Sequence, residues 1–381
     1  MNQNPLLALT ELGQSIWIDH LDRGRIASGE VRDHIRDDGL RGMTSNPTIF
    51  EESISSSHAY DAPIQALARH GSSPAEIYDA ITIEDIQLAA DEFRGVFDGL
   101  DQRDGFVSLE VPPQLAYDTA ATIAEARRLW AAVARPNAMI KVPATRAGVP
   151  AIEALIADGI SINVTLLFGL DRYEEVARAY LAGLEARARA GKPVRIPSVA
   201  SFFLSRIDVA VDAELDDRQR RGTLTPDVAT RLRGQTAIAC ARIAYQRFKR
   251  LFADARFRIL EAGGARSQRL LWASTGTKNP TYSDVYYVDA LIGDDTINTM
   301  PVATFLAYRD HGRPAVRLED DLDRARAVLD GLREAGIDLD AITDRLEHDG
   351  VRKFIASYDK LLQLIAQRRT SALSERHRRT G

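Results

Sequence analysis

Short strand-like runs alternate along the chain with longer amphipathic segments. The runs are five to eight residues long and rich in apolar and β-branched residues, which is typical of buried strands. They cover residues 15–19, 42–46, 106–111, 138–144, 160–167, 194–201, 269–274 and 296–301. The segments between them carry apolar residues at intervals of three and four, as amphipathic helices do. The clearest cover residues 117–134, 171–191 and 225–254, and Thr225 and Pro226 stand where the last of these should begin.

Eight strands that each precede helical sequence predict an α/β fold, a single (β/α)8 barrel of the TIM type with extra C-terminal helices. A doubly wound open sheet is the structural alternative, but "DHLDRGRIASGE" after the first strand lacks the glycine spacing of a dinucleotide site. We therefore expect residues 1–381 to form one barrel domain. Residues 302–371 should be a helical extension packed on the barrel, with helices at 319–336 and 339–369. The polar residues 372–381 should form a flexible tail.

Composition narrows the possible partners and the compartment. The 381 residues are 45% hydrophobic and 27% charged, as in ordinary globular enzymes, and the formal charge of −5 argues against nucleic acid or an anionic membrane as partner. The N-terminus lacks the basic start of a signal peptide, and no apolar run approaches the ~20 residues of a membrane span. The only cysteine, Cys240, excludes an internal disulfide and a multi-cysteine metal site. We expect a cytoplasmic protein.

Polar residues stand at or near the ends of the predicted strands, where the active sites of such barrels lie. They are Asp19, Asn46, Glu110, Lys141, Asn163, Thr165, Ser201 and Ser274. Singly, each has a structural alternative: Asp19 can cap a helix, and Asn46 can form a turn before a proline. Glu110 can lie at a solvated edge, Thr165 can be an ordinary strand residue, and Lys141 can reach solvent from the barrel end. Together, their convergence on one mouth favours a functional site.

Lys141 indicates the chemistry of this site. It lies in the apolar run "NAMIKVPAT" and is the only one of six lysines placed within a predicted strand. Burial disfavours the charged form of an amine, and a free amine can attack a ketone to form a Schiff base. The protonated imine then accepts electrons as a C–C bond breaks, without a metal or an organic cofactor. Asp19 and Glu110 are the candidate proton carriers.

Two later segments suggest a phosphorylated substrate. Arg206 follows Ser201 by five residues and opens a predicted helix, where a guanidinium can bind phosphate oxygens in pairs. The loop "STGTKN" after the seventh strand, with Ser274 and Lys278, has the position of phosphate-binding loops in such barrels. Alone it is typical of a turn with a solvated lysine, but beside Arg206 it favours phosphate binding.

Six motifs in order and at matching spacing resemble the transaldolase family. The resemblance runs from about Asp19 to Pro301, and the length and the C-terminal helices are similar to the longer bacterial form of the family. The motifs are "TSNPTIF" (44–50), "SLEV" (108–111), "IKVPAT" (140–145), "INVTLLF" (162–168), "SFFLSR" (201–206) and "WASTGTKNP" (272–280). The resemblance implies a cofactor-free (β/α)8 barrel of the non-oxidative pentose phosphate pathway. Such an enzyme transfers a dihydroxyacetone unit from sedoheptulose 7-phosphate to glyceraldehyde 3-phosphate, giving erythrose 4-phosphate and fructose 6-phosphate.

The resemblance also implies a role for each candidate residue. Lys141 would attack the C2 carbonyl of the ketose, and Asp19 would take the C4 hydroxyl proton as the C3–C4 bond breaks. Glu110 and Thr165 would hold a water that transfers protons while the imine forms. The resemblance implies that bound dihydroxyacetone is hydrogen bonded by Asn46, Asn163 and Ser201. It implies that the phosphate is bound by Arg206 and Ser274.

One position departs from the family pattern. The family places a second arginine two residues after the serine of the seventh-strand loop, whereas this chain has Gly276 there. The nearest cation is Lys278, which can act as a point charge but lacks the planar fork of arginine.

Three other functions remain open from the sequence alone. The first is a lysine-dependent aldolase that splits fructose 6-phosphate without an obligatory acceptor; such relatives are typically shorter. The second is a barrel that binds sugar phosphates without catalysis. The third is a hydride-transfer barrel that uses Asp19 and Lys141 as acid and base. We expect a monomer or a homodimer that binds sugar phosphates.

Overall fold

Eight parallel strands close into a barrel in chain order, with β8 pairing with β1. The computed structural model describes the backbone of residues 4–380 and the side chains as far as residue 374. The count of eight strands refers to this part of the chain. The strands are β1 (Gln14–Asp19), β2 (Leu40–Thr44), β3 (Phe106–Glu110), β4 (Ala138–Pro143), β5 (Ile162–Leu167), β6 (Ser198–Phe203), β7 (Arg269–Ala273) and β8 (Thr296–Met300). Each overlaps a predicted strand, and the predicted (β/α)8 barrel is confirmed.

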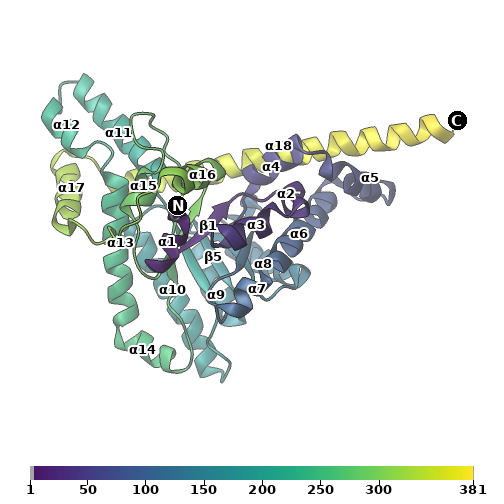
Figure 1. The fold of residues 1–381 in the computed structure, drawn as a ribbon, viewed down its shortest axis with the longest axis horizontal. Helices are drawn as coiled ribbons and strands as arrows, with labels where there is room; N and C mark the ends of the chain where they lie inside the picture. The colour runs from purple at the N-terminus through teal and green to yellow at the C-terminus, as the bar shows by residue number, and fades with distance from the viewer. Residues whose placement is uncertain (1–3, 381) are drawn as a thin grey trace.

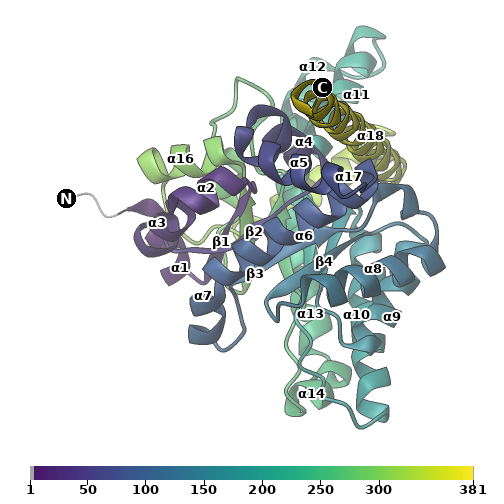
Figure 2. The ribbon, with the colours of Figure 1, turned by 90° about the vertical axis from the view of Figure 1, so that its right-hand side faces the viewer.

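Helices surround the barrel and fill the connections between its strands (Figures 1 and 2). The helices before β8 are α1 (Pro5–Glu11), α2 (Arg23–Ser28), α3 (Glu30–Asp37), α4 (Pro47–Ser56), α5 (Asp61–Arg69), α6 (Pro74–Glu92), α7 (Arg94–Gly99), α8 (Thr119–Val133), α9 (Gly148–Asp158), α10 (Leu170–Arg189), α11 (Ser205–Arg220), α12 (Pro226–Leu232), α13 (Thr236–Ala253), α14 (Ala255–Ala262) and α15 (Tyr286–Ala290), with single 3-10 turns η1 (His58–Tyr60) and η2 (Pro113–Leu115). The helices predicted over 117–134 and 171–191 correspond to α8 and α10. No helix between residues 4 and 380 has both the length and the apolar character that a membrane span requires.

The single helix predicted over 225–254 is wrong, because the segment forms two helices, α12 and α13. Residues 233–235 separate them, and Gly234 adopts φ +66°, a conformation that favours glycine. Its N–H donates to Asp212 Oδ1 at 2.9 Å, and a Cβ at this position would lie 2.5 Å from the hydroxyl of Tyr282. A tertiary contact therefore interrupts a segment whose apolar spacing is continuous. Thr225 is the N-cap of α12, as predicted.

β6 starts four residues later than the run predicted over 194–201. Residues 192–197 are irregular, and both Pro193 and Pro197 lack the amide hydrogen that a sheet ladder needs. The apolar residues of this segment are buried without being part of a strand, and Val194 and Ile196 are at most 9% exposed.

Three helices follow β8, namely α16 (Val302–His311), α17 (Leu322–Glu334) and α18 (Leu339–Thr380). α16 contacts β1 and β8, and α17 packs on α12 and α13. α18 contacts β5 and three elements that follow the carboxyl ends of other strands, namely α4 after β2, η2 after β3 and α11 after β6. The backbone of α18 stays helical to Thr380, where a flexible tail over 372–381 was expected (Figures 1 and 2). The side chains of 375–380, and Gly381, lie outside the described residues.

Bulky side chains fill the amino-terminal half of the barrel interior. Trp17 lies against Gly42, where a Cβ would fall 2.4 Å from the indole ring, and 6.3 Å from the ring of Phe106. The indole Nε1 donates to Asp104 Oδ1 at 2.6 Å, and Arg269 lies 3.5 Å from the same carboxylate. This end of the barrel is therefore packed, and the interior polar groups toward the other end are available for chemistry.

Candidate active site

Lys141 is buried at the centre of the barrel mouth. It lies on β4 beside Glu110 of β3, and its side chain is only 5% exposed. The Nζ atom donates to the carbonyl oxygen of Ser45 at 2.8 Å and lies 3.3 Å from Glu110 Oε2. The lysine therefore does not reach for solvent, and its amine is held at a defined place inside the barrel.

Glu110 is the last residue of β3 and is 6% exposed, which excludes a solvated edge. Burial raises the pKa of its carboxyl to about 7, although the positive charge of Lys141 acts in the opposite direction. The geometry of the ion pair leaves both carboxylate oxygens without a hydrogen-bond partner among the described residues, and the same holds for the buried hydroxyl of Thr165 on β5. Buried polar groups are nearly always hydrogen bonded, so these atoms are suited to binding a small polar molecule.

Asp19 is the last residue of β1 and is half-buried. Its Oδ1 accepts a hydrogen bond from Thr44 Oγ1 at 2.7 Å. The residue that caps the following helix α2 is Asp22, whose side chain accepts from the N–H of Arg25. The alternative of Asp19 as a helix cap is therefore excluded, and its second oxygen has no partner among the described residues.

Asn163 and Ser201 form a polar pair beside the lysine. Asn163 lies next to Lys141 in the sheet and accepts a hydrogen bond from Ser201 Oγ at 2.7 Å. Its amide nitrogen donates to Ser108 Oγ at 3.0 Å, which fixes the orientation of the amide. All these groups are buried, so water does not compete for them.

Asn46 is the N-cap of α4, a structural role different from the turn that was its alternative in the sequence. Its side-chain oxygen accepts from the N–H of Ile49 at 3.0 Å, which is the usual capping contact. The amide nitrogen has no hydrogen-bond partner in the described part of the chain. A donor is therefore available beside Ser45, the residue whose carbonyl holds the lysine.

Arg206 is the second residue of α11, as predicted, and its guanidinium lies 5.4 Å from the ring centroid of Phe203. Burial lowers its pKa, and the nearby charges of Asp19 and Glu110 oppose that shift. No carboxylate within residues 4–374 forms an ion pair with it. A half-buried cation without a counterion is suited to an anionic ligand.

Ser274 contacts the start of the helix that carries Arg206, whereas Lys278 does not. Ser274 adopts φ +55°, unusual for a serine, and its Oγ lies 2.9 Å from that of Ser205, the neighbour of Arg206. Lys278 is exposed and has no ion pair or hydrogen bond to a described residue. The structure thus brings Ser274 to Ser205, the first residue of the helix that carries Arg206, and leaves Lys278 in solvent.

The sequence reasoning missed the contacts that support these groups. Ser45 accepts from the lysine through its backbone, and Ser108 accepts from Asn163. Thr299 lies 2.8 Å from Thr44, hydroxyl to hydroxyl. A signal was available, because a hydroxyl inside a strand that is buried on both faces needs a polar partner. The pattern does not reveal which partner it finds.

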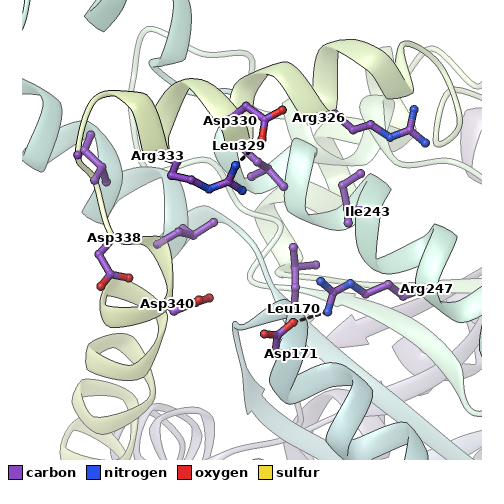
Figure 3. A pocket seen from close by; sticks show the side chains of 13 residues that line it. Leu170, Asp171, Ile243, Arg247, Arg326, Leu329, Asp330, Arg333, Asp338 and Asp340 are labelled. Atoms are coloured by element: carbon purple, nitrogen blue, oxygen red, sulfur yellow. Dashed lines mark hydrogen bonds and ion pairs between the residues drawn. The ribbon is translucent and has the colours of Figure 1, made fainter.

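The largest pocket described lies outside the barrel. It has a volume of about 760 Å³ and is bordered by α10, α13, α17 and the start of α18 (Figure 3). Two ion pairs lie at its wall, Arg247 with Asp171 at 2.6 Å and Arg333 with Asp330 at 2.9 Å. None of the predicted site residues lines it. The candidate residues lie instead at the buried cluster around Lys141.

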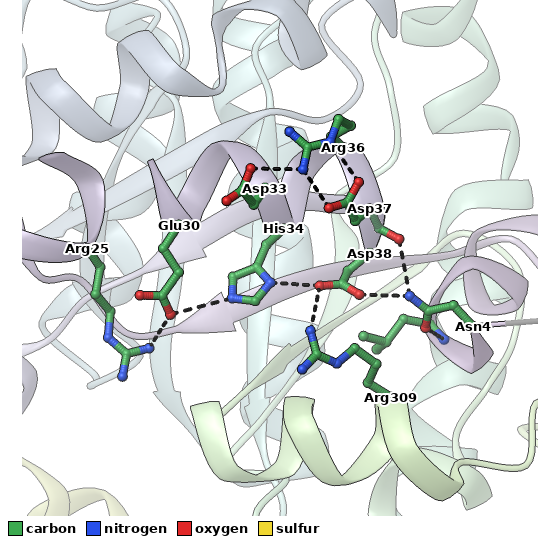
Figure 4. Close-up of polar contacts among 10 residues, drawn as sticks. Asn4, Arg25, Glu30, Asp33, His34, Arg36, Asp37, Asp38 and Arg309 are labelled. Atoms are coloured by element: carbon green, nitrogen blue, oxygen red, sulfur yellow. Dashed lines mark hydrogen bonds and ion pairs between the residues drawn. The ribbon is translucent and has the colours of Figure 1, made fainter. Parts of the chain in front are cut away.

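A second polar cluster lies on the outside of the barrel, where His34 of α3 stands between two carboxylates (Figure 4). Its Nδ1 is 2.7 Å from Asp38 Oδ2 and its Nε2 is 3.6 Å from Glu30. Asp38 also accepts from Asn4 and lies 3.4 Å from Arg309 of α16. The cluster thus ties the chain start and α16 to α3. No three His, Cys, Asp or Glu side chains of the described part are arranged to hold a metal ion.

Comparison with known proteins covers the barrel and most of the C-terminal helices. The profile of the family described as "Transaldolase/Fructose-6-phosphate aldolase" matches residues 16–365. A "Transaldolase 2" from a Nostoc species is 46% identical over 365 residues, which are 94% of this chain and 96% of the relative. A transaldolase from Trichodesmium erythraeum is 44% identical over 374 residues, 97% of this chain and 98% of its own. One from Thermobifida fusca is 45% identical over 366 residues, 96% and 98% of the two chains.

Proposed function

The chain belongs to the transaldolase/fructose-6-phosphate aldolase family and has transaldolase function, and from this premise we propose that Lys141 forms the Schiff base. The observation that carries the proposal is the environment of this lysine. Its buried amine lies 3.3 Å from the buried carboxylate of Glu110, which has no hydrogen-bond partner within residues 4–374, at the mouth where Asp19, Asn163 and Thr165 also lie. A cation that served only the fold would be expected to have its carboxylate fully hydrogen bonded.

Glu110 and Thr165 act in the first half of the proposed reaction. Attack of the neutral amine on the ketose C2 carbonyl gives a carbinolamine, and loss of its hydroxyl as water gives the iminium ion. Both steps move protons between nitrogen and oxygen. A carboxyl with a pKa of about 7 can give and take protons at neutral pH, and a water bound between it and the Thr165 hydroxyl would carry them.

Glu110→Gln is expected to remove the pH dependence of imine formation. In the unaltered enzyme, the rate of imine formation should rise with pH through about 7, because only the ionised carboxylate accepts a proton. The amide cannot ionise, so the variant should lack this rise and form the imine about 100-fold more slowly. Rapid-quench trapping with borohydride at a series of pH values measures both effects.

Glu347→Gln is the matched control. This glutamate on α18 also has a pKa raised to about 7 by burial, but it lies 3.8 Å from Arg172 and makes no hydrogen bond or ion pair to Lys141. In Glu347→Gln, the rate of imine formation should still rise with pH through about 7. A rise that persists in Glu110→Gln would assign the titration to another group.

Three polar groups hold the three-carbon unit in this proposal. Asn163 and Ser201 are linked to each other and lie beside the lysine, where the C1 and C3 hydroxyls of a bound ketose must come. The free amide nitrogen of Asn46 supplies a further donor. The buried, hydrogen-bonded orientation of Asn163 and Ser201 favours one geometry of the imine, which is what bond cleavage requires.

Asp19 is the base in the second half of the proposed reaction, the cleavage of the C3–C4 bond. With the imine formed, its free oxygen removes the proton of the C4 hydroxyl. The C3–C4 bond electrons move to the iminium nitrogen of Lys141, C4 leaves as an aldehyde, and an enamine remains on the lysine. An acceptor aldehyde then reacts by the reverse steps, and hydrolysis of the imine releases the new ketose.

The substrates we propose are sedoheptulose 7-phosphate and fructose 6-phosphate as donors, with glyceraldehyde 3-phosphate and erythrose 4-phosphate as acceptors. Arg206 and Ser274 would bind the phosphate, since the arginine has no counterion among the described residues and the serine hydroxyl contacts Ser205, the neighbour of Arg206 in the chain. Lys278 is exposed and would contribute little. The position of Gly276 leaves the site with one arginine rather than two.

Arg206→Ala is expected to raise the KM for fructose 6-phosphate by about 10- to 100-fold, because charge-assisted bonds to phosphate are lost. The kcat/KM for unphosphorylated fructose should change by less than about threefold. Lys278→Ala serves as a comparison and should have little effect on either sugar. An equal loss for both sugars in Arg206→Ala would take phosphate recognition away from this residue.

Borohydride reduction tests the proposed function directly. The protein is incubated with fructose 6-phosphate, reduced, digested and analysed by mass spectrometry. We expect a reduced three-carbon adduct on Lys141 and, with erythrose 4-phosphate added, formation of sedoheptulose 7-phosphate. Release of free dihydroxyacetone without an acceptor, at the rate of transfer, would indicate an aldolase. The absence of any adduct on a folded protein would overturn the Schiff-base proposal.

We also propose that the protein is cytoplasmic, acts in the non-oxidative pentose phosphate pathway and is a monomer or homodimer. Its one cysteine, Cys240, is buried, as expected of a chain that needs no disulfide. The large apolar residues that the described surface exposes come from separate elements, which supports a small assembly. They are Leu88, Leu100, Tyr117, Val209, Ile259, Leu306 and Val316.

A further inference from the structure

We infer that Thr299 of β8 is a positioning residue for Asp19 and that it acts through the hydroxyl of Thr44. The inference rests on the proposed role of Asp19 in C–C cleavage and adds a contribution from the last strand of the barrel. Three side chains from three neighbouring strands carry it, since β1 lies between β2 and β8.

The three groups form one hydrogen-bonded chain. Thr44 Oγ1 lies 2.7 Å from Asp19 Oδ1, and the hydroxyls of Thr44 and Thr299 lie 2.8 Å apart. Both threonines are 2% exposed, so solvent does not replace either bond. This hydrogen-bonded chain connects Asp19 to Thr299, which lie 280 positions apart in the sequence. Only the closure of the barrel brings them together.

The direction of the chain follows from hydrogen counting. An ionised carboxylate only accepts hydrogen bonds, so the single hydroxyl hydrogen of Thr44 goes to Asp19. Thr44 can then only accept from Thr299, which must donate. Because hydrogen bonds in such a chain polarise one another, the Thr299 hydroxyl makes Thr44 a better donor to the carboxylate.

This arrangement assigns different tasks to the two oxygens of Asp19. Oδ1 is held by Thr44, whereas Oδ2 has no hydrogen-bond partner among the described residues. Oδ2 is therefore the oxygen that removes the C4 hydroxyl proton. Without the anchor, the carboxylate would lose the hydrogen bond that fixes its orientation, and Oδ2 would no longer be held toward the C4 hydroxyl.

Thr299 also connects the base to the phosphate loop. Its carbonyl oxygen accepts from Thr275 Oγ1 at 3.3 Å, and Thr275 follows Ser274. Thr299 thus contacts Thr44 through its hydroxyl and the loop after β7 through its backbone. A substitution of the Thr299 side chain leaves this backbone contact in place, which allows the hydroxyl to be tested alone.

Thr299→Val removes the hydroxyl and keeps the shape. We expect C–C cleavage of fructose 6-phosphate to slow by about 5- to 20-fold, while KM and imine formation change by less than about twofold. Mass spectrometry after borohydride reduction distinguishes the steps, because uncleaved substrate leaves a six-carbon phosphorylated adduct on Lys141 and cleaved substrate a three-carbon adduct. The ratio of six- to three-carbon adduct should rise in the variant.

Three comparisons separate positioning from a general structural effect. Thr299→Ser, which keeps the hydroxyl, should restore most of the cleavage rate, whereas Thr299→Ala should not. Thr236→Val makes the same change at a buried threonine of α13 whose hydroxyl has no hydrogen-bond partner in the described part of the chain, and it should be neutral. In an Asp19→Ala background, Thr299→Val should cause no further loss, since no carboxylate remains to be held.

Several results would overturn the inference. They are wild-type cleavage in Thr299→Val, equal rates in Thr299→Ser and Thr299→Ala, or a further loss in the Asp19→Ala background. If Thr299→Val does not fold, the Ser and Ala pair still decides the question. A lack of any adduct on Lys141 in the unaltered protein is a different result, because it contradicts the proposed function and not the hydroxyl chain.

Discussion

Replacing Lys141 with alanine is expected to abolish transfer, lowering kcat/KM by about 10⁴-fold or more, because no covalent intermediate can form without the amine. The trapped adduct should disappear with the activity. The other lysines, at positions 192, 249, 278, 353 and 360, are exposed or partly exposed to solvent, so none can replace it. Steady-state kinetics with fructose 6-phosphate and erythrose 4-phosphate, together with adduct mapping, measure both losses.

Lys141→Ala should remain folded. Removing the ammonium leaves Glu110 without a cation, but its pKa is already about 7, so the carboxyl takes up a proton and avoids a buried unpaired charge. The lost bond to the Ser45 carbonyl should lower the free energy of unfolding by about 1–3 kcal/mol, which thermal unfolding detects.

Lys192→Ala is the control for Lys141→Ala, since Lys192 is exposed, and it should keep full transfer. Turnover above about 1% of wild type in a folded Lys141→Ala protein would contradict the Schiff-base role.

Asp19→Asn is expected to have the second-largest effect, slowing C–C cleavage by about 10²- to 10⁴-fold. The amide has nearly the shape of the carboxylate and can still accept from Thr44, but it cannot take the C4 hydroxyl proton. Imine formation should continue, so the six-carbon adduct on Lys141 should accumulate. Borohydride trapping over time after mixing with fructose 6-phosphate follows this adduct.

Asp22→Asn controls for the chemical change at a neighbouring position. Asp22 caps α2, and asparagine caps helices about as well as aspartate, so activity and stability should be retained. If Asp19→Asn cleaves the substrate at the normal rate, another group is the base. Loss of both adducts would instead make Asp19 necessary for imine formation.

The positions of the strands, and of the candidate residues on them, could be predicted from the sequence because they depend on local patterns. A strand buried on both faces is an apolar run, and a polar residue inside it stands out. Lys141 and Glu110 were identified in this way. Arg206 was correctly placed at the start of a helix because that helix begins where the sixth strand ends.

Some segments could not be read from local patterns. The apolar spacing of 225–254 continues through Gly234, whose left-handed conformation depends on contacts with Asp212 and Tyr282. β6 begins only after Pro197.

The sequence by itself determined the barrel, the number and order of its strands, and the mouth at which the polar residues meet, because strand period and the common direction of parallel strands are local rules. Only the tertiary structure decided which groups touch. Barrel closure brings Thr299 of β8 to Thr44 of β2, and through it to Asp19. It also leaves Glu110 and Thr165 without hydrogen-bond partners among the described residues. Hydrogen-bond partners depend on distances across the barrel, and no periodicity along the chain encodes those distances.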